Sequence, residues 1–298
     1  GVNMVPFYIY YSMFGFQRIG DLAWAAGDSR ARGFLIGGTA GRTTLAGEGL
    51  QHQDGHGMVQ AALIPNCLSY DPTYAYEMAV IIHDGMKRMY VDQQDVYYYI
   101  TAMNENYQQP AMPKGVEEGI IKGMYLLKGG GKKKKKVQLM GSGTILREVI
   151  AAAELLNKDW GVDADIWSCT SFNELAREAQ DVERYNRLHP LEKPRVPYVS
   201  QQFKGHRGPV IAATDYIQQY AEQVRQWIPA SYSVLGTDGF GRSDTRVELR
   251  RHFEVNSVNI VVAALKGLAD DGVLPAVKVA EAIEKYGINS EKANPLLA

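Results

Sequence analysis

The amino-acid sequence predicts an α/β protein with two tandem three-layer domains, each built around a mostly parallel sheet. Short apolar runs alternate with helical stretches of roughly ten to seventeen residues, which is typical of βαβ units. This alternation occurs twice, and a segment rich in proline, glycine and lysine separates the two series. The length of 298 residues also suits about two domains of ordinary size.

The first series occupies residues 1–105 and predicts the first domain. Its predicted strands are the apolar runs FYIYY, GFLIGG, ALIPNCLSY and VYYYIT. Helical spacing of apolar residues predicts helices over residues 15–31 and about 73–89. A loop rich in glycine and histidine follows GFLIGG. Because open α/β sheets hold their ligands beside the carboxyl ends of strands, this loop is a candidate functional segment.

Residues 106–136 are predicted to be a linker. They contain Pro110, Pro113, a glycine triplet and five consecutive lysines in GGGKKKKK. No aromatic residue interleaves the lysines, so the run favours a solvated segment over a nucleic-acid patch.

The second series occupies residues 137–298 and predicts the second domain. Its predicted strands are VQLMGSG, ADIWSCTS, PVIAATD and YSVLGTDGFG. The predicted helices run from an N-cap at Ser142 or Thr144 to about Asp159, from about Asn173, over 216–227, over 246–253, and as a hairpin on either side of Gly272.

Composition narrows the classes of partner and compartment. The net charge of −1 offers no electrostatic case for nucleic acid or an anionic membrane as the main partner. Two distant cysteines, Cys67 and Cys169, suggest neither a disulfide framework nor a zinc site, so we expect a reducing cytoplasm. No apolar run is long enough to span a bilayer. The sequence starts without methionine and reaches an aromatic run by residue 7, which leads us to expect a piece of a longer polypeptide.

The loop GEGLQHQDGHG, residues 47–57, concentrates groups that carry chemistry. His52 and His56 stand four residues apart, but the surrounding glycines disfavour a helical metal site and no third ligand follows at a known spacing. The loop has carboxylates and no lysine, which disfavours a phosphate site. A mobile loop that presents acid and base groups remains, with a purely structural role open for each histidine.

Several longer motifs resemble one enzyme family. They are YYSMFGFQRIGD, GTAGRTTLAGEGLQHQDGH, NCLSYDPTYAYE, VYYYITAMNENY, and YSVLGTDGFGRSD followed by RRHFEV. Together they closely resemble the second half of the homodimeric bacterial type of pyruvate dehydrogenase, the decarboxylating component that depends on thiamine diphosphate. The resemblance extends from about residue 5 to the final NPLLA and departs clearly only in the glycine-lysine segment. Transketolases resemble the chain more loosely, through a GEDGPTHQ segment that aligns with residues 47–53.

The resemblance implies a transketolase-like architecture and a set of partners. Residues 1–105 would form most of a pyrimidine-binding domain, and residues 137–298 the C-terminal domain. The family's diphosphate-binding domain, with the ligands of the diphosphate and Mg²⁺, has no counterpart in the sequence, so no metal-ligating residue is assigned. The resemblance further implies a homodimer of the full subunit and no activity for this chain alone.

The resemblance also implies cofactor-binding roles for three residues. Phe14 matches the aromatic residue that stacks on the aminopyrimidine ring of thiamine diphosphate, and Tyr11 matches a tyrosine close to cofactor and substrate. Arg18 lies one helical turn beyond Phe14 and is expected to face the same site. Without the family match, Phe14 would be assigned to the core and Arg18 to a surface salt bridge.

Two further residues match the catalytic groups of the family. Glu48 and His52 correspond to acid–base residues that move protons while the acetyl unit from pyruvate passes to the lipoyl group of dihydrolipoyl acetyltransferase. A histidine suits this role because its pKa is near neutrality. His56 and Asp54 are expected to orient the loop, His252 to be structural, and GTDGFGRSD to be a structural loop between the domains.

Two other functions remain open from the sequence. A transketolase-like ketol transferase is disfavoured because YYSMFGFQRIGD and GTDGFGRSD resemble the dehydrogenase. A non-catalytic module for binding or assembly would instead require that the chain bind a lipoyl-bearing transacetylase by itself.

Overall fold

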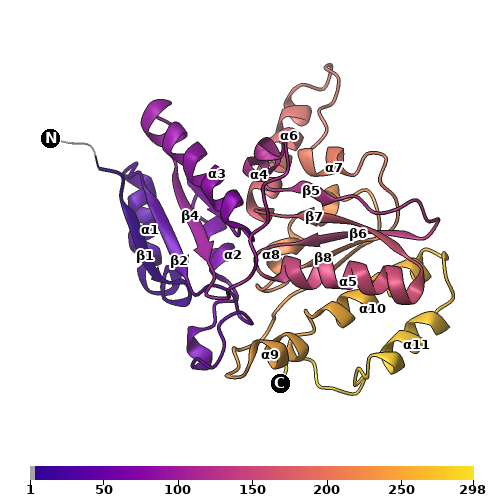
Figure 1. Cartoon of the computed structure of the whole chain (residues 1–298). Helices are drawn as coiled ribbons and strands as arrows, with labels where there is room; N and C mark the ends of the chain where they lie inside the picture. Colours follow the sequence, from indigo (N-terminus) through magenta and orange to yellow (C-terminus); the bar gives the residue numbers. More distant parts are fainter. Residues whose placement is uncertain (1–3) are drawn as a thin grey trace.

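Two α/β units lie side by side in the computed structural model, which describes residues 4–298 (Figure 1). The N-terminal unit contains a four-stranded sheet and the C-terminal unit a five-stranded sheet. The predicted fold class is therefore confirmed. The predicted domain boundaries at residues 105 and 137 stay predictions.

The first sheet is parallel throughout. Its strand order is β1 (Phe7–Tyr11), β2 (Phe34–Gly38), β4 (Tyr97–Ala102) and β3 (Cys67–Tyr70). Aromatic and β-branched residues fill β4, and all but its last residue are buried, as expected for a strand covered on both faces.

Two helices of the first unit follow the predicted alternation. They are α1 (Phe16–Asp28) and α3 (Ala75–Met86), and a π-turn at Lys87–Val91 extends α3 to the predicted end of that helix. A third helix, α2 (Gly57–Ala62), was not predicted, and it ends at the first residue of the predicted strand ALIPNCLSY, of which only Cys67–Tyr70 forms a strand. One short 3₁₀ turn, Ser12–Phe14, directly follows β1. Another, Leu50–His52, interrupts the histidine-rich loop.

The segment 106–136 is more ordered than the sequence suggested. It contains α4 (Glu117–Lys122) and β5 (Tyr125–Lys128), which pairs antiparallel with β7 (Asp163–Ser168). Buried Ile120 and Tyr125 supply the apolar contacts that fix these elements. The lysines from 132 to 135 are exposed, as predicted for a solvated run.

The second sheet has the order β5-β7-β6-β8-β9, and every pairing except that of β5 is parallel. The remaining strands are β6 (Lys136–Gly141), β8 (Val210–Ala213) and β9 (Tyr232–Leu235). Successive residues of β6 face opposite sides, so Leu139 packs in one apolar cluster and Met140 in the other.

Helices cover both faces of the second sheet (Figure 1). One layer holds α5 (Ile145–Trp160), α9 (Arg246–His252), α10 (Ser257–Asp270) and α11 (Val277–Lys285). The other holds α6 (Phe172–Leu188), α7 (Tyr198–Gln202), α8 (Gln219–Glu222) and a 3₁₀ turn at Arg225–Trp227. The predicted helix over 216–227 is wrong at its start, because the backbone N–H of Ile217 donates to the carbonyl of Gly55.

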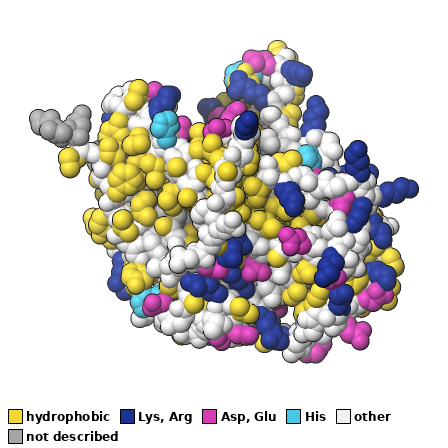
Figure 2. Space-filling model, in the orientation of Figure 1, with side chains coloured by type: hydrophobic (Ala, Val, Ile, Leu, Met, Phe, Trp, Pro, Cys, Tyr) yellow, Lys and Arg dark blue, Asp and Glu magenta, His cyan; other side chains and the backbone are white. Residues whose placement is uncertain are grey.

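The two edges of the first sheet differ in exposure. At one edge, Arg177 of α6 donates to the carbonyls of Pro65 and Cys67 beside β3. At the other edge, β1 exposes Tyr8 and Ile9, and apolar side chains gather over the N-terminal unit in Figure 2. No helix within residues 4–298 has the length and apolar character needed to cross a membrane.

Candidate active site

Four of the five predicted site residues meet at the carboxyl end of β1. Tyr11 ends this strand, Phe14 lies in the following 3₁₀ turn, and Arg18 lies in the first turns of α1. His52 approaches them from the loop after β2. Because β1 and β2 are parallel neighbours, their carboxyl ends open on the same edge of the sheet.

The four side chains form an aromatic cluster with a cation on one side. The ring centroids of Phe14 and His52 are 5.0 Å apart, and those of Tyr11 and His52 are 5.6 Å apart, both in edge-on geometry. The guanidinium carbon of Arg18 lies 4.0 Å from the centroid of Phe14, which is a cation–π contact. Arg18 therefore lies beside Phe14 and covers part of its ring, and its cofactor-binding role stays a prediction.

The cluster fits a flat polar heterocycle. Tyr11 is 45% exposed and Phe14 is half-buried, so aromatic surface is available for stacking. Nδ1 of His52 is buried and has no hydrogen-bond partner within residues 4–298. An unpartnered ring nitrogen beside open aromatic surface can donate to or accept from a bound group.

No hydrogen bond or ion pair within residues 4–298 joins Glu48 to this cluster. Glu48 is half-buried in the same loop, and it makes no hydrogen bond or ion pair with any other residue that the structure describes. Its assignment as an acid–base residue stays a prediction.

Asp54 organises the end of the histidine-rich loop. From the sequence we expected it to orient the loop, but no contact could be named for it. Its buried carboxylate accepts hydrogen bonds from the backbone N–H groups of His56 and Gly57, at 3.0 and 2.7 Å, and from the hydroxyl of Ser12. It therefore links the start of α2 to the turn that carries Phe14.

His56 forms a hydrogen bond with Gln17 of α1 through its Nε2. Burial lowers the pKa of His56. The negative charge of Asp54 acts to raise this pKa, and the positive charge of Arg42 acts to lower it further. The histidine pair that first suggested a metal site thus has separate partners. Within residues 4–298, no group of three or more His, Cys, Asp or Glu side chains is arranged to hold a metal ion.

Buried polar residues that the sequence did not single out join the loop to the second unit. Asp215 accepts from the hydroxyls of Thr43 and Thr44, both at 2.6 Å, and Arg42 donates to the carbonyl of Thr237 at 2.7 Å. Burial raises the pKa of Asp215. The only local signal was the polar run RTT inside an otherwise apolar and glycine-rich stretch.

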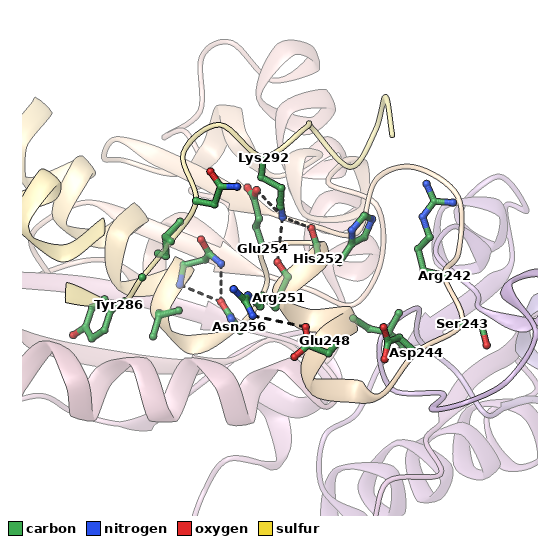
Figure 3. Close-up of a pocket in the computed structure, with 16 residues that line it drawn as sticks. Arg242, Ser243, Asp244, Glu248, Arg251, His252, Glu254, Asn256, Tyr286 and Lys292 are labelled. Atoms are coloured by element: carbon green, nitrogen blue, oxygen red, sulfur yellow. Dashed lines mark hydrogen bonds and ion pairs between the residues drawn. The ribbon is translucent and has the colours of Figure 1, made fainter. Parts of the chain in front are cut away.

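A cavity lies in the C-terminal unit. It has a volume of about 590 Å³ and lies between α9, the start of α10 and residues 286–292 (Figure 3). Two of its cations are paired, since Lys292 contacts Glu254 at 2.9 Å and Arg251 faces Glu248 at 3.9 Å. Nε2 of His252 is buried without a partner among the described residues.

Comparison with known proteins finds two family models and several relatives that are similar to the chain. Residues 1–110 match the model of the pyruvate dehydrogenase E1 component middle domain, and residues 123–256 match that of the transketolase-like TK C-terminal domain. The chain is 66% identical over 295 residues to the pyruvate dehydrogenase E1 component of Pseudomonas aeruginosa. It is 63% identical over 298 residues to that of Cupriavidus necator and 63% identical over 297 residues to that of Escherichia coli. Over nearly its whole length the chain is therefore similar to part of the pyruvate dehydrogenase E1 component.

These similarities cover 98–99% of the chain but only 33% of each relative. The chain thus spans about a third of the length of these curated relatives, and not the half that the motifs suggested.

Solved transketolases share the fold at low identity. The enzyme from Campylobacter jejuni aligns over 88% of this chain and 36% of its own, with a TM-score of 0.65 and 17% identity. A chain described as a split gene transketolase, inactive beta4 tetramer, aligns over 89% of this chain and 77% of its own, with a TM-score of 0.63 and 15% identity. The tandem α/β arrangement is therefore that of the transketolase fold.

Proposed function

We propose that this chain supplies the pyrimidine-binding and C-terminal domains of a subunit that decarboxylates pyruvate and transfers the acetyl unit to the lipoyl group of dihydrolipoyl acetyltransferase. The observation that carries the proposal is the meeting of Tyr11, Phe14, Arg18 and His52 at one strand end, in a chain similar to part of the pyruvate dehydrogenase E1 component.

Each of these side chains has a distinct task in the proposed reaction. Thiamine diphosphate, when bound, supplies the electron sink that allows a 2-oxo acid to lose carbon dioxide. Phe14 and Tyr11 hold its flat ring by stacking and edge contacts. His52 holds or releases a proton at Nδ1 or Nε2 as the acetyl unit leaves for the lipoyl sulfur.

The proposal includes partners and surroundings outside this chain. Mg²⁺ and the diphosphate would be held by residues of the longer subunit, and the subunit would work as a cytoplasmic homodimer. The exposed apolar residues of β1 and α1, which include Ile9 at 70% and Leu22 at 66% exposed, give the N-terminal unit a surface suited to burial in an assembly. The split gene transketolase chain is described as inactive, and we propose that this chain is likewise inactive alone.

The proposal is tested by changing His52 to alanine in a subunit of the relatives' length that contains this chain. We expect the affinity for thiamine diphosphate to stay within about threefold of wild type, because Phe14 and Tyr11 remain in place. Transfer of the acetyl unit to lipoamide should fall by roughly 10² to 10⁴-fold, which is typical of the loss of an acid–base group. Calorimetric titration of the cofactor and a lipoamide acetylation assay measure the two effects.

His83→Ala is the matched control, since His83 is exposed on α3 of the same unit. This variant should retain both properties. A collapse of cofactor affinity in the His52 variant would show that the histidine has another role. Faster turnover of sugar phosphates than of pyruvate by the wild-type subunit would instead support the ketol-transferase alternative.

A further inference from the structure

The histidine loop, which we define as residues 45–53, is fastened by one of its own side chains. Gln53 is completely buried although its neighbours Gln51 and Leu50 are exposed. Nε2 of Gln53 donates to the carbonyl oxygen of Leu45 at 3.3 Å. This hydrogen bond joins the last residue of the loop to its first.

The other end of the same carboxamide reaches the second unit. Oε1 of Gln53 accepts a hydrogen bond of 2.7 Å from the backbone N–H of Arg242. Arg242 belongs to the interdomain loop, residues 236–244, whose sequence GTDGFGRSD was predicted to be structural, and this contact joins that loop to the histidine loop. Figure 3 shows Arg242, Ser243 and Asp244 where this loop passes beside the N-terminal unit.

The two loops fit each other closely. A side chain at Gly241 would place its Cβ 2.2 Å from the carbonyl oxygen of Leu50 and 3.0 Å from Oε1 of Gln53. The backbone N–H of Gly47 also donates to the carbonyl of Asp244 at 3.0 Å. The histidine loop is thus held at its start, middle and end by the interdomain loop.

His52 itself has no comparable polar restraint. Its ring lies edge-on to Phe14 and Tyr11, and its Nδ1 has no hydrogen-bond partner within residues 4–298. The backbone of the histidine loop therefore decides where the imidazole lies, and Gln53 is the adjacent residue that fixes this backbone.

We infer that Gln53 is the positioning residue of His52, and that its carboxamide sets the imidazole by tying both ends of the histidine loop to the interdomain loop. This inference rests on the proposed function for its kinetic effect. Its structural part, a loop fastened by a buried carboxamide, can be measured without any activity.

The test is Gln53→Met in the full-length subunit, because methionine has similar volume and makes neither hydrogen bond. Acetyl transfer to lipoamide should fall by about 10 to 100-fold, as expected when a catalytic group is displaced by about 1 Å. Thiamine diphosphate affinity and the KM for pyruvate should change by less than about threefold.

Gln53→Glu should lose less of the acetyl transfer than Gln53→Met, since a carboxylate still accepts from Arg242 but cannot donate to Leu45. Gln51→Met, an exposed glutamine in the same loop, is the matched control and should behave as wild type.

Two further measurements separate positioning from simple loss of stability. In a His52→Ala background, Gln53→Met should cause less than about a twofold further loss of transfer, because residues that act as a unit are not additive. Amide hydrogen exchange over residues 45–53 should quicken in Gln53→Met and stay unchanged in Gln51→Met.

The inference is overturned if Gln53→Met transfers acetyl units at the wild-type rate, if its loss is fully retained in the His52→Ala background, or if the exchange of residues 45–53 is unchanged. A wild-type subunit with no activity on pyruvate would refute the proposed function instead, and the exchange comparison would still decide whether Gln53 fastens the loop.

Discussion

At the scale of single residues, buried carboxylates show how far tertiary surroundings shift the pKa of a side chain. Asp71 follows β3 and is completely buried. Its Oδ1 accepts from the hydroxyl of Thr101 at 2.7 Å, while its Oδ2 is buried with no partner among the described residues. Burial raises the pKa of Asp71 to about 7, although the hydrogen bond from Thr101 acts in the opposite direction. These contacts keep the Asp71 carboxyl neutral in the folded protein over much of the acidic pH range.

We predict that Asp71→Asn will flatten the pH dependence of stability. The folded-state pKa of about 7 lies above the unfolded value near 4, so the stabilising contribution of protonated Asp71 is complete below about pH 4 and is lost as the pH rises through 7. The free energy of unfolding of the wild type should therefore fall by roughly a few kcal/mol across this window because of Asp71. Denaturant unfolding at a series of pH values checks this.

Asp21→Asn is the control for this experiment, because Asp21 is exposed on α1. It should keep the wild-type pH profile. An Asp71→Asn profile that runs parallel to that of wild type from pH 4 to 7 would rule out a titrating Asp71.

The family resemblance, and not a local pattern, pointed to the residues that meet through local chain geometry. Tyr11, Phe14 and Arg18 lie within eight consecutive residues, and one strand end followed by a helix brings them together. Gln53 could not be singled out in this way, because its role depends on Arg242, 189 residues away. A glutamine in a polar loop carries no sign of burial in the sequence itself.

At the scale of elements, apolar periodicity predicted the strands and most helices, and tertiary hydrogen bonds account for the main failure. The backbone of residues 216–217 bonds to Thr237 and Gly55 instead of continuing a helix. Periodicity counts apolar side chains and says nothing of such backbone contacts. The linker prediction missed α4 and β5 for a related reason, since the prolines and lysines around them hid a short run of residues that packs against α3 and β7.

The start of α2 offers a test at this scale. We predict that Asp54→Ala will lower the free energy of unfolding by about 2 kcal/mol, because the N–H groups of His56 and Gly57 and the hydroxyl of Ser12 all lose an acceptor. Asp54→Asn should lose less, since its amide oxygen can still accept from the two N–H groups. Urea unfolding measures both. Equal stability of Asp54→Ala and wild type would show that α2 begins without help from this cap.

At the scale of the whole molecule, the two units share one apolar cluster and several buried polar links. The cluster contains Met58 and Tyr70 of the first unit together with Phe172 and Tyr216 of the second. A group of ion pairs closes the other side of the junction, where Glu105, beyond β4, contacts Arg147 of α5 and Arg250 of α9. Arg147 and Arg250 lie 42 and 145 residues from Glu105 in the sequence. Contacts at such separations produce no local pattern, so the sequence could not predict this junction.

Glu105 tests whether this junction stabilises the molecule. Burial acts to raise the pKa of Glu105, but hydrogen bonds and charge attraction from Arg250 and Arg147 outweigh it and lower the pKa. The carboxylate therefore contributes stability above its unfolded pKa, and this contribution is lost as the pH falls through the lower folded value.

We predict that Glu105→Gln lowers the free energy of unfolding at pH 7 by about 2 kcal/mol, because Arg250 is only 7% exposed and keeps Glu148 as its remaining partner. The difference from wild type should shrink as the pH falls through the lowered folded pKa, because wild-type Glu105 then becomes neutral as well. Glu154→Gln, on the exposed face of α5, should match wild type throughout the same denaturation series. A gap of the same size at pH 3 and pH 7 would mean that Glu105 acts through its shape and not through its charge.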